Sequence, residues 1–187
     1  MKDFNFKSIL PHLLVVVVFM LLTIIYFNPL LSGKAINQGD VERFKGMSKE
    51  IVDYRAKYDK EPLWTNGMFS GMPAYQISVL YPSNWVRPLI KVTSMGIPHP
   101  ACIIFLCMLG FYLLLLTFKV DRLLAAAGAV GFALSSYFVI LIEAGHNPKG
   151  YAIAYMAPVV MGIMMAYRGR MWAGSAVASI SLLLELA

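Results

Sequence analysis

Long apolar runs separated by short polar breaks dominate the sequence. The first run covers residues 13–31 and contains few polar side chains. At 1.5 Å per residue, it is about long enough to cross a hydrocarbon core of roughly 30 Å. This pattern predicts four complete transmembrane helices and a fifth that is incomplete. The four further runs cover residues 101–118, 123–144, 151–167 and 171–187.

The first apolar run differs from a cleaved signal peptide. Such a peptide has a shorter apolar core and an Ala-x-Ala-like exit, and neither feature precedes the Ser-Gly-Lys at 32–34. We therefore expect a retained first helix. The last run has no polar flank and still contains Glu185. We expect it to continue beyond residue 187, in a longer polytopic protein of which this chain is the N-terminal piece.

Residues 32–100 form a long, more polar loop between the first two runs. Within it, residues 41–60 lack proline and place apolar side chains near helical spacing. Asp40 stands at the expected N-cap and Glu42 in the first turn. These features predict an amphipathic helix on the outer membrane face. Turns follow it, and their large aromatic rings suit a membrane interface; these rings include Trp64, Phe69 and Trp85.

Composition supports an integral membrane protein. Hydrophobic residues make up 59% of the chain and charged residues 14%, whereas about 25% charged residues is usual in soluble domains. The net charge is +6, but the basic residues flank the apolar runs, so we set nucleic-acid binding aside. Cys102 and Cys107 lie inside an apolar run without metal-ligand spacing. They indicate neither a disulfide framework nor a zinc site.

Lysine and arginine are distributed unequally among the short segments. They concentrate in the N-terminal tail and in two breaks between helices, at Lys2, Lys7, Lys119, Arg122, Arg168 and Arg170, whereas the opposite short segment has only Lys149. The positive-inside rule therefore predicts a multi-pass protein of the inner (cytoplasmic) membrane, with its N-terminus in the cytoplasm. Residues 1–31 would hold the tail and first helix, 32–100 the outer (periplasmic) loop, and 101–187 helices two to five of an all-α polytopic bundle.

Several motifs occur in order along the chain. They are Gln-Gly-Asp at 38–40, Trp-Thr-Asn at 64–66, Phe-Ser-Gly-Met-Pro-Ala-Tyr at 69–75, and Glu-Ala-Gly-His-Asn-Pro-Lys at 143–149. In this combination the chain resembles the YfhO family of large bacterial membrane proteins. The resemblance implies a fold and activity like those of C-type glycosyltransferases. Such enzymes transfer a sugar from a polyprenyl-phosphate donor to an acceptor, here a glycan or envelope polymer on the outer face.

The resemblance gives Asp40 a candidate catalytic role. An acidic residue in the first outer loop of C-type glycosyltransferases acts as general base or metal ligand, and Asp40 occupies that position. A carboxylate there can take the proton of the acceptor hydroxyl. The acidic-x-acidic spacing of Asp40 and Glu42 also suits a divalent cation such as Mg²⁺ or Mn²⁺. The competing interpretation is structural, because an Asp before a helix caps its unpaired N–H groups.

Glu143, His146 and Lys149 form a second candidate group, expected at the outer end of the helices. We expect them to bind the donor, since a leaving lipid phosphate needs cationic and hydrogen-bonding partners. Lys149 supplies a charge, His146 a donor, and the helix after Pro148 its unpaired N–H groups. The alternative is a tight turn with a snorkelling lysine.

Two other interpretations remain at this point. A non-enzymatic transporter or lipid-handling protein would use the same polar group to bind a head group without chemistry. The chain contains no Walker loop, Rossmann fingerprint, haem motif or nucleophile elbow, so ATP-driven transport and redox chemistry have no support. Small residues such as Gly128, Gly131 and Gly162 predict close packing between helices.

Overall fold

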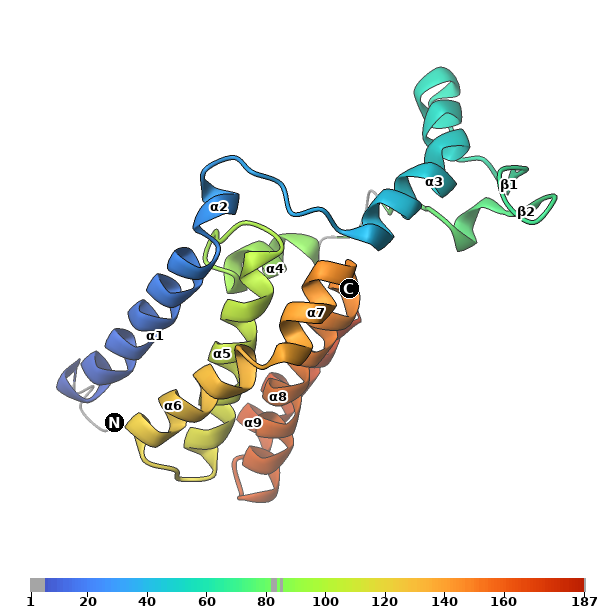
Figure 1. Ribbon diagram of the computed structural model, residues 1–187. Helices are drawn as coiled ribbons and strands as arrows, with labels where there is room; N and C mark the ends of the chain where they lie inside the picture. Colours follow the sequence, from blue (N-terminus) through green and yellow to red (C-terminus); the bar gives the residue numbers. More distant parts are fainter. Residues whose placement is uncertain (1–5, 82–83, 85, 187) are drawn as a thin grey trace. The chain divides into compact units, whose positions relative to one another are not determined.

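Helices dominate the computed structural model, which describes residues 6–81, 84 and 86–186 (Figure 1). Helix accounts for 72% of the structure, and the described residues contain nine α-helices. The prediction of an all-α protein is confirmed at this level. The chain divides into two compact units. The hairpin unit comprises Asn37–Asn84 and Glu143–Gly145, and the bundle unit comprises the remaining described residues.

The bundle unit contains every apolar run that the sequence pattern predicts. Its helices are α1 (Phe6–Tyr26), α2 (Asn28–Leu31), α4 (Arg87–Thr93), α5 (Ala101–Thr117), α6 (Arg122–Ala133), α7 (Ser136–Ala144, whose last two residues belong to the hairpin unit), α8 (Asn147–Tyr167) and α9 (Met171–Glu185).

Two of these helices are long and apolar enough to cross a membrane, from Ser8 to Tyr26 in α1 and throughout α8. The run at 123–144, expected as one helix, is instead the pair α6 and α7, bent by 40° at a short break; counted together they make a third candidate span. α5 and α9 are shorter, with 17 and 15 residues. The expected four complete spans are therefore reduced to two, or three with the bent pair.

The boundaries of the first and fourth expected helices also differ from the prediction. α1 ends at Tyr26, and the chain re-enters a helix as α2, which has Pro29 in its first turn. Proline has no N–H to donate, so it fits the first turn of a helix best, although Pro11 in α1 and Pro158 in α8 do lie inside helices. α8 begins at Asn147 rather than at residue 151, again with a proline, Pro148, in its first turn.

Helix α5 is the centre of the bundle unit and packs against α1, α6 and α8. Its first eight residues, 101–108, are all buried, as expected for a helix that is apolar on every side. Further along, the Tyr112 hydroxyl lies 2.7 Å from His12 Nδ1, and the Tyr112 ring contacts Phe19 edge-on. These contacts join α1 to α5, while most of the α1 surface remains exposed.

Helices α8 and α9 cross at glycines, with backbone against backbone. A Cβ added to Gly162 would lie 2.4 Å from Ala178 N, and one added to Gly174 would lie 2.4 Å from Ala166 N. Each helix therefore contributes a Gly-x-x-x-Ala pair, the spacing that permits close helix approach. The prediction for Gly162 is confirmed. The prediction for Gly131 is wrong, because nothing lies within 4 Å of its added Cβ.

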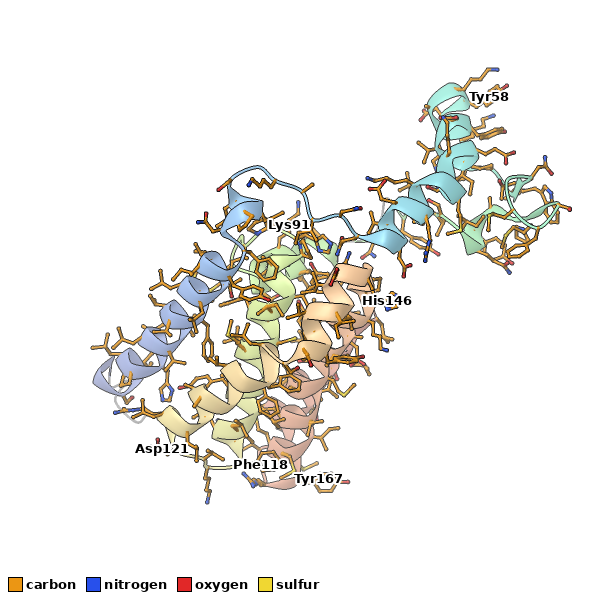
Figure 2. The ribbon with its side chains drawn as sticks, in the orientation of Figure 1. Tyr58, Lys91, Phe118, Asp121, His146 and Tyr167 are labelled. Carbon is orange, nitrogen blue, oxygen red and sulfur yellow. The ribbon has the colours of Figure 1, made fainter. Side chains whose placement is uncertain are left out.

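The side chains labelled in Figure 2 show which residues lie at each end of the bundle unit. Phe118, Asp121 and Tyr167 lie at one end, and Lys91 and His146 lie at the other. The two breaks that carry Lys119, Arg122, Arg168 and Arg170 adjoin the first of these ends in sequence. The orientation predicted from the charge distribution stays a prediction.

The hairpin unit consists of one long helix and a small hairpin. Helix α3 (Gly39–Tyr58) is followed by strands β1 (Trp64–Thr65) and β2 (Met72–Pro73) and by the 3₁₀ helix η1 (Ala74–Gln76). The strands are antiparallel, with Trp64 opposite Pro73. The predicted helix at 41–60 is confirmed within two residues at each end. Its expected cap is wrong, because the N-cap is Gln38 and Asp40 lies inside the first turn.

Candidate functional site

Asp40 and Glu42 lie in the first turn of α3. Asp40 pairs with Arg43 at 3.2 Å, and Glu42 pairs with Lys45 at 2.7 Å. Side chains two residues apart are separated by about 200° around the axis of a helix, so they lie on nearly opposite faces. Helix α3 therefore does not direct both carboxylates to one ion. The described residues also contain no group of three or more His, Cys, Asp or Glu that could hold a metal. The two residues do not fit a shared metal site.

Within the hairpin unit, the start of α3 lies against the segment that contains Glu143. A Cβ added to Gly145 would lie 3.3 Å from Asp40 Cβ and 3.2 Å from Gln38 Cβ. Gly145 also has φ of +95°, which L side chains rarely adopt. Glycine is thus required here twice, for its backbone conformation and for the close approach. The structure brings Asp40 beside the Glu143–Gly145 segment, and Glu143 itself is exposed.

His146 and Lys149 belong to the bundle unit, at the start of α8. His146 is the N-cap residue of α8, and its side chain makes no capping hydrogen bond. Lys149 Nζ lies 5.6 Å from the centre of the Tyr137 ring on α7, a cation–π contact. Both side chains are exposed. Asn147 and Pro148, which lie between them in the sequence, line a cavity.

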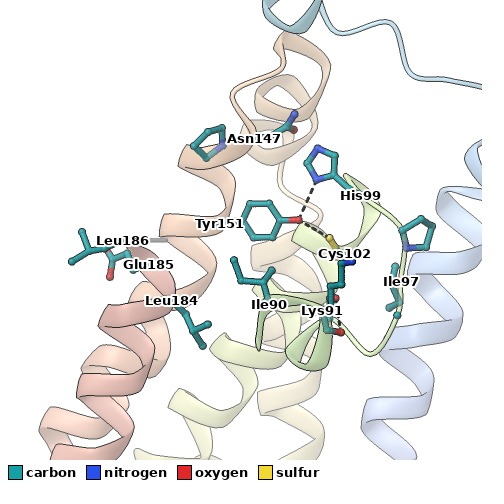
Figure 3. A pocket seen from close by; sticks show the side chains of 14 residues that line it. Ile90, Lys91, Ile97, His99, Cys102, Asn147, Tyr151, Leu184, Glu185 and Leu186 are labelled. Atoms are coloured by element: carbon teal, nitrogen blue, oxygen red, sulfur yellow. Dashed lines mark hydrogen bonds between the residues drawn. The ribbon is translucent and has the colours of Figure 1, made fainter. Parts of the chain in front are cut away.

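This cavity of about 830 Å³ lies at the end of the bundle unit where α5 and α8 begin (Figure 3). Its walls come from α4, the 94–100 segment, the starts of α5 and α8, and the end of α9. Apolar side chains predominate, among them Ile90, Ile97, Leu184 and Leu186. Lys91 and Glu185 are the charged residues that line it within the described part of the chain.

A polar group lies on one wall of the cavity. The Tyr151 hydroxyl lies 3.1 Å from His99 Nδ1 and 3.0 Å from Cys102 Sγ, as the dashed lines in Figure 3 mark. The His99 and Tyr151 rings also stack, with 14° between their planes. All three groups are satisfied when the Cys102 thiol donates to Tyr151 and the Tyr151 hydroxyl donates to His99. That arrangement places the remaining imidazole proton of His99 on Nε2.

The surroundings of His99 favour the neutral imidazole. Apolar neighbours remove water from the ring and lower the pKa of His99 below its ordinary value, although part of the ring stays accessible. Near neutral pH the group therefore acts as a hydrogen-bond donor or proton acceptor rather than as a fixed cation. Lys91 is then the residue that supplies a permanent positive charge to this cavity.

His99, Tyr151 and Lys91 were not among the site residues predicted from the sequence. His99 stands between Pro98 and Pro100, and Tyr151 opens an apolar run, so neither has a motif of its own. One signal was present, because Asn147, Tyr151 and Tyr155 recur every four residues and so share one face of an otherwise apolar helix. The Tyr155 hydroxyl meets Thr93 Oγ1 at 2.7 Å, and this contact ties α8 to α4.

No protein-family model, no curated protein and no solved structure matches the chain.

Proposed function

We propose that this chain is the membrane part of a glycosyltransferase-like protein, of the kind that its motifs resemble in the YfhO family. It would take a sugar from a polyprenyl-phosphate donor and transfer it to a glycan or envelope polymer at the outer face of the inner membrane. The observation that carries the proposal is the apolar cavity at the start of α5 and α8, with Lys91, His99 and Tyr151 on its walls.

The cavity suits a lipid with a polar head. Apolar walls such as those of Ile90 and Leu184 can take up a polyprenyl chain from the bilayer core without exposing it to water. A phosphate needs a cation and hydrogen-bond donors, which Lys91 and His99 supply. His146 and Lys149 adjoin the lining residues Asn147 and Pro148 in sequence and add a donor and a second cation.

In this proposal Asp40 is the general base, and Glu143 helps to bind the donor. Both lie in the hairpin unit, where the segment ending at Gly145 packs beside Asp40. A base must reach the acceptor hydroxyl within hydrogen-bond distance in the complex with substrate. No step is assigned to a metal ion, because Asp40 and Glu42 diverge on α3 and each pairs with its own cation.

The test is binding of a short polyprenyl phosphate carrying one hexose to the purified chain in nanodiscs. Lys91→Met, His99→Ala, His146→Ala and Lys149→Met each remove one proposed partner of the phosphate, and Lys57→Met is the matched control in the hairpin unit. Losing a hydrogen bond to a charged group should weaken binding by about tenfold or more. The control should bind normally. Unchanged affinity in all four variants, or equal affinity for the unphosphorylated polyprenol, would contradict the proposal.

A second candidate is a lipid-handling protein that binds the same head group without chemistry. The cavity lining favours this candidate. Among the described residues that line the cavity, Glu185 is the one carboxylate, so the cavity itself offers few acidic groups for a transfer reaction. The two candidates separate in one assay with the hexose-bearing donor and an acceptor glycan. Release of free polyprenyl phosphate that depends on Asp40 supports transfer, whereas binding without release supports lipid handling.

A further inference from the structure

The hairpin unit divides sharply into a charged part and an uncharged part. Twelve charged residues lie between 39 and 61, which covers α3 and the turn after it. Residues 62–86 contain no Asp, Glu, Lys or Arg at all. A segment of that length without charge is unusual for a surface that only meets water, since about a quarter of residues in soluble domains are charged.

The uncharged part nevertheless exposes its largest apolar side chains. Leu63 is 85% exposed and Phe69 84%, and Tyr75 and Trp64 are 63% and 57% exposed. These four residues are here called the hairpin tip. Leu63 directly precedes β1, Trp64 lies in β1, Phe69 lies in the turn between the strands, and Tyr75 lies in η1. Single exposed apolar residues are normal, but four of them close together in one uncharged segment favour an interaction with an apolar partner.

The backbone of the turn is held in a conformation that few sequences adopt. Phe69, Ser70 and Gly71 have φ of +48°, +61° and +121°, so two non-glycine residues occupy the left-handed region in succession. Gly71 packs directly on the Trp64 ring, where an added Cβ would lie 2.7 Å from Nε1. Strain of this kind persists only where the surrounding structure fixes it, and it is concentrated at functional sites.

Two side chains of α3 fix the uncharged part in place. Glu50 Oε2 accepts hydrogen bonds from Thr65 Oγ1 at 2.6 Å and from the Asn66 amide at 3.0 Å. Arg55 donates to Glu61 Oε2 at 2.8 Å and to the Ser78 carbonyl at 2.9 Å. The hairpin is thus held on both sides while its apolar tip makes few contacts of its own.

We propose that the hairpin tip inserts into the interface of the same bilayer that the bundle helices cross. The proposal rests on the bundle being a membrane unit. It requires neither donor binding nor transfer. Trp and Tyr favour the head-group level because their rings are apolar and their edges polar, and Leu63 and Phe69 add purely apolar area.

Two observations favour lipid over other partners. A sugar would use the flat rings and the Trp64 N–H, but that N–H already donates to Asn66 Oδ1 at 3.2 Å, and Leu63 has no ring. The hairpin unit is also tethered to the bundle unit, since only residues 32–36 separate it from α2 in sequence. An extended chain of that length reaches at most about 18 Å, which keeps the local concentration of membrane surface high.

The test measures depth in the full chain, with Cys102 and Cys107 replaced by alanine and the protein in nanodiscs. A nitrobenzoxadiazole (NBD) fluorophore is attached at Leu63→Cys, and the control carries it at Lys49→Cys on the charged α3. Lipids bearing doxyl groups quench from within the bilayer, and iodide quenches from water. We expect the probe at 63 to be quenched by doxyl lipid and shielded from iodide, and the probe at 49 to show the reverse.

A second variant measures the contribution of the tip itself. With the probe at 63, Phe69→Ser should lower the ratio of inserted to withdrawn probe by a factor on the order of ten or more, the usual effect of losing one buried aromatic side chain. Phe44→Ser, an exposed ring on α3, should leave the ratio unchanged. Iodide access at 63 would overturn the proposal. Shielding from both quenchers would overturn it too, because it would show that protein rather than lipid covers the tip.

Discussion

Replacing Gly174 with alanine should separate α8 from α9. The added Cβ would lie 2.4 Å from Ala166 N and 2.5 Å from Gly162 O, whereas ordinary contacts are 3.4 Å or longer. Both neighbours are backbone atoms, which cannot rotate away as a flexible side chain would. The helices must therefore move apart by about 1 Å, enough to lose a quarter to a half of the dispersion energy of each contact across the crossing.

The steric cost in the free energy of unfolding can be isolated by comparison with a matched substitution elsewhere in the bundle unit. Overpacking of this kind costs typically about 1–3 kcal/mol of the free energy of unfolding. Alanine also favours a helix over glycine by about 1 kcal/mol, which partly offsets that cost. Gly131→Ala in α6 has the same helix gain with nothing within 4 Å of the new Cβ. The difference between the two variants isolates the steric cost of the crossing, and we expect about 1–3 kcal/mol.

Buried thiols provide the assay. Cys102 and Cys107 are 3% and 1% exposed, so a thiol-reactive dye reports unfolding during a denaturant titration in detergent micelles. The double variant Gly162→Ala with Gly174→Ala should be less destabilised than the sum of the two single variants, because both act on one crossing. A Gly174→Ala protein as stable as Gly131→Ala would refute the backbone contact between α8 and α9.

Three further outcomes are expected. A membrane-impermeant thiol reagent applied outside should label a cysteine at Lys57 and not one at Arg168, since the short basic segments predict a cytoplasmic N-terminus; the reverse pattern would reverse the orientation. The Thr65 hydroxyl holds the pKa of Glu50 below the ordinary glutamate value of 4.5. The ionised carboxylate therefore stabilises the hairpin above pH 4.5, and this contribution is lost as pH falls through the lowered folded-state pKa. Protection of the hairpin amides from hydrogen exchange, measured relative to the intrinsic exchange rate at each pH, should fall there, and Glu50→Gln should remove that fall. Asp40→Asn should lower sugar transfer by about a hundredfold or more in the complete protein, with normal membrane abundance, because the amide cannot take a proton; normal transfer would restrict the residue to a structural role.

The candidate site shows where sequence reasoning reached its limit. The residues predicted to bind the donor were Glu143, His146 and Lys149, whereas the residues of that segment that line the cavity are Asn147 and Pro148. The sequence did not predict the polar group on the cavity wall. His99 and Tyr151 are 52 residues apart and meet only when the 94–100 segment folds against α8. Asp40 was expected at the N-cap, but the helix starts two residues earlier than predicted, so Asp40 lies in its first turn and Gln38 is the N-cap.

The sequence by itself determined which segments of the chain form helices. Apolar periodicity and proline positions depend on neighbours within one or two turns, so they indicated helices in all five apolar runs, and in residues 41–60, before any tertiary contact was known. Tertiary structure decided which of those surfaces meet. Gly162 packs against Gly174 and Gly131 faces open space, although both are helical glycines, because a close crossing requires a matching partner on another helix. The cavity beside Tyr151 likewise depends on packing between segments distant in the chain, which local patterns do not encode.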